Sequence, residues 1–384
     1  MAADLGCYNV ADLRERARRR LPLGIWEYAE RGVEDECAMA RNRAAFDAVT
    51  FRPRVLRNVE KIDTSTQVFG RPIPFPLAIA PTGAAGLMWH KGDLALARAA
   101  AKAGVPFIIS SASTMDLEQI AEAGGRQWFQ LYLWEDRSLS LAVIDRAWAL
   151  GCEALFVTLD LPVPPNREYI RRNGFGTPFN INGRNTLDVL THPRWLTGVM
   201  GRYMLEGGIP TQANLPDRLR AKVTKGAPPG ALFKQDDLDW EGIGKLRDCW
   251  PGKLVLKGVL HPEDAERALT IGADGIVVSN HGGRALDCSI AAIEALPAIA
   301  AAVAGRMTVF LDSGVRRGSD VVKAVALGAD AVLAGRAPLY GLAAFGETGV
   351  ARALDLLRSE TKRTMAMLGA RTAEEVRAAL SPAP

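Results

Sequence analysis

Eight short apolar runs recur along the chain, and stretches with helical periodicity separate most of them. The runs occupy residues 77–81, 106–110, 128–133, 154–160, 253–257, 275–280, 308–312 and 331–335. Several helical stretches end at a glycine, such as Gly104 and Gly272, which is typical of a left-handed C-cap. Apolar strands that alternate with helices predict an α/β fold with a parallel sheet covered on both faces. Eight such units predict a closed TIM (β/α)8 barrel, and a doubly wound open sheet is the alternative.

A barrel of this type takes roughly 250 residues, so this chain of 384 residues has two surplus segments. The first precedes the barrel, and we expect it to be helical over residues 10–30 and irregular afterwards. The second is a long insertion after the fourth strand, called here the excursion. The expected single domain, 1–384, therefore comprises an N-terminal segment (1–76), the barrel (77–168 and 237–368) and the excursion (169–236).

The excursion is rich in Gly, Pro, Asn and Arg, and residues 192–205 mix apolar with basic side chains. Long connections of this kind are usually functional or mobile. It could cover the active site as a lid, form a subunit contact, or rest on a membrane surface. The apolar side chains that would meet the membrane are Trp195, Leu196, Val199, Met200, Met204 and Leu205.

Charge and cysteine content argue against several classes of protein. The 47 Lys and Arg residues nearly balance 43 Asp and Glu, and they are spread along the chain, so we expect no nucleic-acid ligand. The five cysteines lie far apart without a C-x-x-C motif, which predicts reduced thiols and no metal site. Neither an apolar signal region nor a run of about 18 apolar residues occurs, so a cytoplasmic protein is expected.

Chemistry in such a barrel collects at the carboxyl ends of the strands. The last two strand ends carry Asp-Ser-Gly-Val-Arg-Arg-Gly at 312–318 and Gly-Arg at 335–336. Glycines let backbone N–H groups approach phosphate oxygens, and arginines bind phosphate through bidentate hydrogen bonds. These loops predict a phosphorylated ligand, which could be the substrate or a cofactor.

Three further strand ends carry groups suited to acid–base and anion chemistry. His281 is the candidate base, and Asp160 could orient its ring and stabilise its cation. Arg167 and Arg284 could bind a substrate carboxylate. Lys257 could form a Schiff base or hold a fixed positive charge beside a cofactor, and the residues alone leave both open.

The run Ser-Asn-His-Gly-Gly-Arg at 279–284, followed by Leu286 and Asp287, resembles the active-site signature of the FMN-dependent L-2-hydroxy-acid oxidases and dehydrogenases. That family includes glycolate oxidase, flavocytochrome-type lactate dehydrogenase and (S)-mandelate dehydrogenase. The resemblance extends from about Asn9 to Val376, and stretches such as 91–99 and 339–344 are most similar to the mandelate branch.

The resemblance implies a role for each strand-end residue. Backbone and side chains that would bind FMN are those of Pro81, Thr82, Gly83, Ser110, Gln130, Thr158, Lys257 and Ser279. The FMN phosphate would be bound by Asp312, Ser313, Gly314, Arg316, Gly335 and Arg336. The substrate would be bound by Tyr28, Tyr132, Arg167, His281 and Arg284, and the catalytic residues would be His281, Asp160, Tyr132 and Lys257. On this interpretation Lys257 stabilises the anionic reduced flavin.

Gly83 stands where many oxidases of the family have alanine, and Ala112 stands where glycolate oxidase has tryptophan. Both residues leave room for an aromatic substrate. The resemblance therefore implies oxidation of (S)-mandelate or a similar acid to the 2-oxo acid, with electrons passed to a membrane quinone or another acceptor. The resemblance also implies a homotetramer, peripheral on the inner face of the cell membrane.

Two alternatives within the family are an L-lactate dehydrogenase and an oxygen-using oxidase. Outside the family, a Schiff-base aldolase would use Lys257 as its nucleophile. A ligand-binding barrel without catalysis would need neither the base nor the paired arginines. The residues do not decide between transfer of a hydride and removal of the α-proton.

Overall fold

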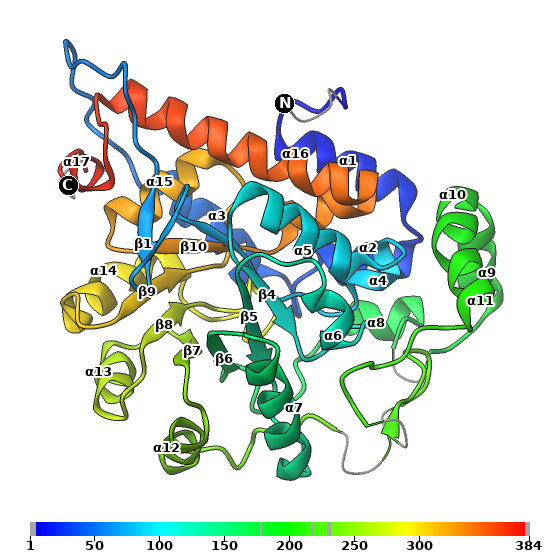
Figure 1. Cartoon of the computed structure of the whole chain (residues 1–384). Coiled ribbons are helices and arrows are strands. Elements are labelled where there is room, and N and C mark those ends of the chain that lie inside the picture. Colours follow the sequence, from blue (N-terminus) through cyan, green and yellow to red (C-terminus); the bar gives the residue numbers. More distant parts are fainter. Residues whose placement is uncertain (1–4, 177–178, 217–218, 227, 229–231, 381–384) are drawn as a thin grey trace.

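Eight parallel strands close into a barrel in the order β10-β3-β4-β5-β6-β7-β8-β9 (Figure 1). The structure is a computed structural model and describes residues 5–176, 179–216, 219–226, 228 and 232–380. The strands are β3 (Leu77–Ile79), β4 (Phe107–Ser110), β5 (Gln127–Leu131), β6 (Ala154–Thr158), β7 (Lys253–Val259), β8 (Gly275–Val278), β9 (Thr308–Leu311) and β10 (Ala331–Ala334). Closure confirms the predicted barrel and excludes the open sheet.

Helices follow the strands and cover the outside of the barrel (Figure 1). They are α4 (Ala85–Met88), α5 (Gly92–Ala103), α6 (Leu117–Ala121), α7 (Arg137–Ala149), α12 (Trp240–Cys249), α13 (Pro262–Thr270), α14 (Ala292–Val303), α15 (Gly318–Ala326) and α16 (Arg336–Leu368). Helix α16 is kinked at Phe345 and Gly346, and α17 (Ala373–Arg377) follows it. Within the described residues, no helix combines the length and apolar character that a membrane span needs.

The amino end of the barrel is closed by apolar packing. Phe69, in the turn between β1 (Thr66–Val68) and β2 (Arg71–Ile73), stacks edge-on against Trp128 and Phe310, with ring centroids 5.6 and 5.8 Å apart. Trp128 in turn stacks on Phe156 inside the barrel, 5.3 Å away. Because this end is filled, a ligand must enter the barrel from the carboxyl end of the strands.

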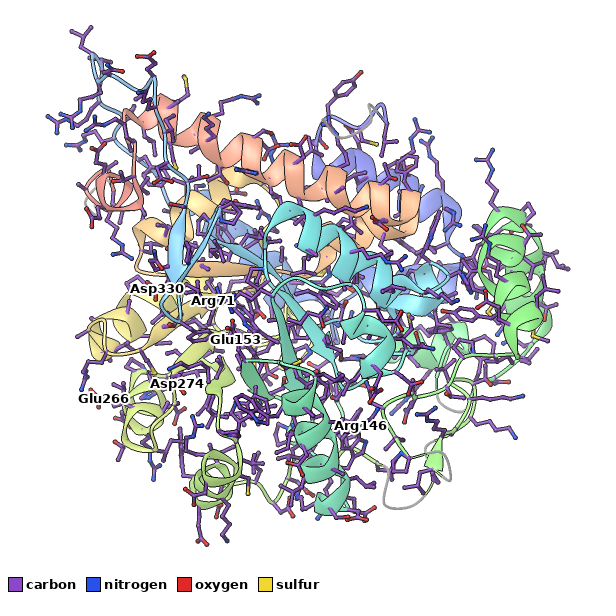
Figure 2. The ribbon with its side chains drawn as sticks, in the orientation of Figure 1. Arg71, Arg146, Glu153, Glu266, Asp274 and Asp330 are labelled. Carbon is purple, nitrogen blue, oxygen red and sulfur yellow. The ribbon has the colours of Figure 1, made fainter. Side chains whose placement is uncertain are left out.

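Charged groups at the amino end have partners within the protein (Figure 2). Arg71 pairs with Glu153 at 2.8 Å, and Glu153 also accepts from the indole of Trp128. Asp274 accepts from the Leu254 N–H, and Asp330 from the Val309 N–H, at 3.0 and 2.9 Å. These contacts join neighbouring strands, and they occupy the charged groups that could otherwise bind a ligand at this end.

The N-terminal segment differs from the expectation of one helix over residues 10–30. It forms α1 (Val10–Arg20) and α2 (Leu23–Glu30), because Pro22 lacks an N–H and forces Leu21 into an extended conformation. The stretch expected to be irregular contains a further helix, α3 (Cys37–Ala48), and the β1–β2 hairpin. Helix α1 packs against α16, which anchors the segment to the barrel (Figure 1).

The excursion projects from one side of the barrel, and most of its helical residues lie between 183 and 206 (green in Figure 1). Its helices are α8 (Glu168–Asn173), α9 (Gly183–Leu190), α10 (Pro193–Trp195), the π-helix η1 (Leu196–Gly201) and α11 (Arg202–Glu206).

The structure corrects part of the expected membrane surface. Trp195 and Val199 are buried against the barrel, and the Trp195 indole donates to the Leu87 carbonyl at 2.7 Å. Only Met204 and Leu205, of the six residues expected to meet the membrane, are mostly exposed, at 62% and 90%. Spacings of four residues place Trp195 and Val199 on the inner face of the helix.

Candidate active site

A cavity of about 470 Å³ opens at the carboxyl end of the barrel. Of the residues predicted to form the site, those lining it are Tyr28, Pro81, Thr82, Gly83, Ser110, Tyr132, Thr158, Arg167, Lys257, His281, Arg284, Asp312, Ser313, Gly314, Arg316, Gly335 and Arg336. The remaining three, Gln130, Asp160 and Ser279, contact these lining residues from behind. The structure therefore brings all the predicted site residues together.

Strand periodicity explains why polar groups meet at this end. Side chains two residues apart on a strand point to the same face. On six of the eight strands, an apolar residue inside the barrel is therefore followed, two positions later, by a polar residue nearer the carboxyl end. The pairs are Ile108 and Ser110, Trp128 and Gln130, Phe156 and Thr158, Val255 and Lys257, Val277 and Ser279, and Phe310 and Asp312. The filled lower barrel thus supports a polar floor.

His281 lies between Asp160 and Tyr132. Its Nδ1 is 2.8 Å from Asp160 Oδ1, and its Nε2 is 3.2 Å from the Tyr132 hydroxyl. Burial lowers the pKa of His281 below its usual range, although the Asp160 charge opposes this. Burial would raise the pKa of Asp160, but the charges of His281 and Lys257 outweigh it and lower that pKa. A carboxylate at Nδ1 fixes the proton there, so the Nε2 lone pair faces the cavity.

Lys257 is a buried cation at the end of β7. Its Nζ lies 3.1 Å from Ser279 Oγ and 3.2 Å from Asp312 Oδ2. Burial alone would lower the pKa of Lys257, but the charges of Asp312 and Asp160 raise it above its usual value. A Schiff-base lysine needs a lowered pKa to be nucleophilic. The geometry therefore favours a fixed charge over the aldolase alternative.

Arg167, immediately before α8, and Arg284, on the loop after β8, both line the cavity. Arg284 donates to the backbone carbonyls of Tyr28 and Arg31 and lies 5.2 Å above the Tyr28 ring. Burial, reinforced by the Arg284 charge, lowers the pKa of Arg167, and its buried Nε has no hydrogen-bond partner among the described residues. Within the part of the chain that the structure describes, neither guanidinium group is paired with a carboxylate, which suits an anionic ligand.

The loops after β9 and β10 bring together groups that suit a second anion. Ser313 and Gly314 have positive φ values of 72° and 113°, so the backbone turns sharply beside the N-terminus of α15. Among the described residues, neither Arg316 nor Arg336 is paired with a carboxylate. Together with Lys257 and the unpartnered Thr82 hydroxyl, these groups fit a flavin with a phosphate tail.

Sequence reasoning missed an apolar wall of the cavity. Residues 161–165 and Leu232 line it, and Phe233 packs on Tyr132 and Trp134 with ring centroids 5.0 and 5.6 Å away. The Leu232 carbonyl accepts from the Glu135 N–H at 2.8 Å, which pins this segment beside β5. Residues 232–235 end the excursion, and no strand-end pattern marks them.

A parallel barrel that brings a histidine oriented by a carboxylate, a buried lysine and four arginines to its open end is suited to a cofactor-dependent enzyme that acts on an anionic substrate. The model of the FMN-dependent dehydrogenase family matches residues 17–382. The chain belongs to this family, as its sequence signature predicted, and its cofactor is FMN. It is an FMN-dependent 2-hydroxy-acid oxidoreductase.

Known relatives include enzymes for two substrates. (S)-mandelate dehydrogenase of Pseudomonas putida is 43% identical over 363 residues, covering 94% of this chain and 90% of the relative. L-lactate dehydrogenase of Ectopseudomonas mendocina (strain ymp) is 41% identical over 370 residues, covering 95% and 96%. The crystal structure of (S)-mandelate dehydrogenase, described as a monotopic membrane protein, superposes with a TM-score of 0.90 at 40% identity, covering 98% of this chain and 99% of that one. Mandelate oxidase with benzoyl-formic acid gives 0.81 at 38% identity, covering 98% of each chain.

Proposed function

We propose that this enzyme oxidises (S)-mandelate or a similar aromatic L-2-hydroxy acid to the 2-oxo acid and passes the electrons to a membrane acceptor such as a quinone. The observation that carries the proposal is the small pair Gly83 and Ala112. A Cβ atom on Gly83 would lie 3.1 Å from the Ala112 Cβ and 3.2 Å from the Tyr28 hydroxyl. Gly83 thus packs closely against Ala112 and Tyr28, where a side chain would crowd the Tyr28 hydroxyl. All three residues line the cavity, the first two without a bulky side chain, and the apolar wall ending at Phe233 suits a phenyl group.

The polar residues of the cavity divide into two tasks in this proposal. Arg167 and Arg284 bind the substrate carboxylate, and the Tyr28 and Tyr132 hydroxyls fix the hydroxy acid between them. His281 Nε2 accepts the proton that the substrate loses, and Asp160 stabilises the resulting imidazolium through Nδ1. FMN, when bound, supplies the two-electron acceptor. Lys257 keeps its positive charge fixed beside Asp312 throughout.

The visible spectrum of the purified holoenzyme tests the substrate and the acceptor together. It is recorded anaerobically, then after (S)-mandelate or L-lactate is added in separate cuvettes, and again after air is admitted. Fast bleaching with mandelate, slow bleaching with lactate and slow recovery in air are the expected results. Equal or faster bleaching with lactate would instead support an L-lactate dehydrogenase, which the 41% identical relative favours. Fast recovery in air would support an oxidase, like the structurally similar mandelate oxidase.

The outer face of the excursion is the proposed membrane contact. Its exposed apolar side chains are Ile181, Leu187, Leu190, Met204 and Leu205. Exposed arginines accompany them at 184, 194 and 202, which suits an anionic lipid surface. The (S)-mandelate dehydrogenase structure is described as that of a monotopic membrane protein, which supports a membrane contact here.

Sedimentation with vesicles that contain an anionic lipid tests this contact. The double variant Met204→Ser with Leu205→Ser should lower the bound fraction of holoenzyme. Leu56→Ser is a matched control, since Leu56 is fully exposed on the loop between α3 and β1. Equal binding of all three proteins would contradict the proposal. The homotetramer stays a prediction that light scattering can test.

A further inference from the structure

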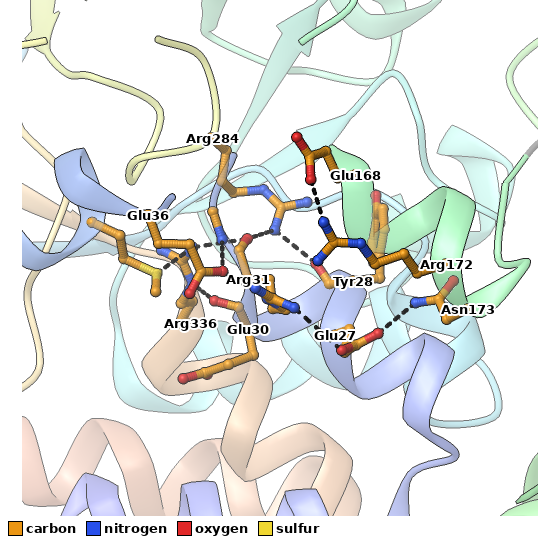
Figure 3. Close-up of polar contacts among 12 residues, drawn as sticks. Glu27, Tyr28, Glu30, Arg31, Glu36, Glu168, Arg172, Asn173, Arg284 and Arg336 are labelled. Carbon is orange, nitrogen blue, oxygen red and sulfur yellow. Dashed lines mark hydrogen bonds and ion pairs between the residues drawn. The ribbon is translucent and has the colours of Figure 1, made fainter. Parts of the chain in front are cut away.

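Tyr28 belongs to the N-terminal segment, so something must fix this segment against the barrel rim. Helix α2 ends at Glu30, and the last carbonyl groups of a helix have no partner within it. Two arginines from the barrel satisfy them (Figure 3). Arg284 Nη1 donates to the Tyr28 and Arg31 carbonyls at 2.7 and 2.8 Å, and Arg336 Nε donates to the Glu30 carbonyl at 3.1 Å.

Arg336 also reaches the loop that carries the base. Its Nη1 donates to the carbonyl of Gly282, the residue after His281, at 2.9 Å. A Cβ atom on Gly282 would lie 2.8 Å from that nitrogen, so the guanidinium packs directly on the loop. Its Nη2 lies 3.4 Å from the Arg31 carbonyl. One side chain therefore joins the end of α2 to the His281 loop.

The charge of Arg336 has no carboxylate partner among the described residues. The carboxylate of nearby Glu30 instead binds Arg14 and the Tyr340 hydroxyl. Burial, with the charge of Arg316, lowers the pKa of Arg336 to about 10. Carbonyl groups at a helix C-terminus stabilise a cation only partly. An anion at Gly335 and Arg336, where the FMN phosphate is expected, would supply the missing partner.

We propose that Arg336 is a positioning residue that couples the FMN phosphate to the substrate site. The phosphate holds the guanidinium, and the guanidinium holds both the segment with Tyr28 and the loop with His281. This inference rests on the proposed placement of the phosphate and not on the identity of the hydroxy acid. Arg316 offers a contrast, because among the described residues its guanidinium donates a hydrogen bond only to the carbonyl of Val315 in its own loop.

Hydrogen exchange of the wild-type enzyme tests the coupling without a substitution. FMN should slow exchange in peptides that cover residues 22–36 and 279–287. Riboflavin carries the same ring without the phosphate, and at saturation it should leave the 22–36 peptides near their unprotected rate. Equal protection by riboflavin and FMN would overturn the proposal. A lack of mandelate oxidation would leave this outcome unaffected, so the two proposals fail independently.

Substitutions then assign the coupling to one side chain. Arg336→Lys keeps the charge but loses the geometry that reaches several carbonyls, and Arg316→Lys is the matched control. At saturating FMN, we expect exchange at 22–36 to be about tenfold faster in Arg336→Lys, as for the loss of about one hydrogen bond to a charged group. The KM for the hydroxy acid should rise as well. Arg316→Lys should weaken FMN binding yet keep wild-type exchange once saturated, and wild-type exchange in Arg336→Lys would refute the assignment.

Discussion

Replacing Asp160 with Asn should slow substrate oxidation by about 100-fold or more. Asp160 Oδ1 lies 2.8 Å from His281 Nδ1 in a buried site. At an effective dielectric constant of about 20, a full charge pair at that distance is worth at most about 6 kcal/mol. The positive charge of Lys257 and local relaxation reduce the effect, and retaining about half gives about 3 kcal/mol, or about 100-fold in rate. An Asn side chain can also donate to Nδ1 and so move the proton to Nε2.

The assay is the anaerobic rate of flavin reduction at saturating hydroxy acid, measured by stopped flow. Asp330→Asn is a suitable control, because Asp330 accepts a backbone N–H at the opposite end of the barrel (Figure 2). The control should reduce its flavin at the wild-type rate. If Asp160→Asn bound FMN normally and lost less than about threefold in rate, a charged partner for His281 would not be part of the mechanism.

Three further outcomes follow from the same site. The value of kcat/KM should rise with pH and level off with a midpoint below the usual range of histidine, because burial lowers the pKa of His281. In Asp160→Asn the midpoint should move lower still, since the Asp160 charge raises that pKa, and a pH–rate profile with the same midpoint in both proteins would show that His281 is not the base. Ala112→Trp should raise the KM for mandelate far more than the KM for lactate, because the new ring occupies the space beside Gly83 and Tyr28. Equal effects on the two KM values in steady-state kinetics would argue against an aromatic pocket there. Phe233→Ala removes one aromatic contact worth about 1 kcal/mol, so it should raise the KM for mandelate about fivefold. The KM for lactate should stay within about twofold, and an unchanged ratio of the two KM values would place the phenyl group elsewhere.

The barrel could be predicted because its determinants are local and repeated. Pairs such as Phe156 and Thr158 show the alternation that fills the lower barrel and exposes polar groups above it. The break between α1 and α2 was missed, because the prediction of one helix over residues 10–30 gave no weight to Pro22, which lacks the N–H that a helix interior needs. The helical excursion was less predictable, because Trp195 and Val199 become buried only against the finished barrel.

Contacts between distant segments set the limits of the sequence analysis. Phe233 reaches Tyr132 because the backbone on either side of it is hydrogen-bonded to the segment that follows β5. No strand-end motif predicts this pairing. The predicted phosphate ligand Arg336 illustrates the same limit. Its side chain binds carbonyl groups of residues more than fifty positions away, so one arginine joins three segments. Motifs therefore predicted which residues gather in the cavity, while the couplings among them depended on the folded arrangement.

The balance of charge in the cavity links the two ligands. Arg167, Arg284, Arg316, Arg336 and Lys257 are cationic, and the adjoining carboxylates are Asp160 and Asp312. The excess of positive charge is close in magnitude to the combined negative charge of a phosphate dianion and one carboxylate. In the proposed arrangement, the phosphate would compensate the Arg316 and Arg336 end, and a hydroxy-acid carboxylate would compensate the other. A neutral amide analogue would leave Arg167 and Arg284 buried without an anion, so the same charges that retain the cofactor also select for acidic substrates.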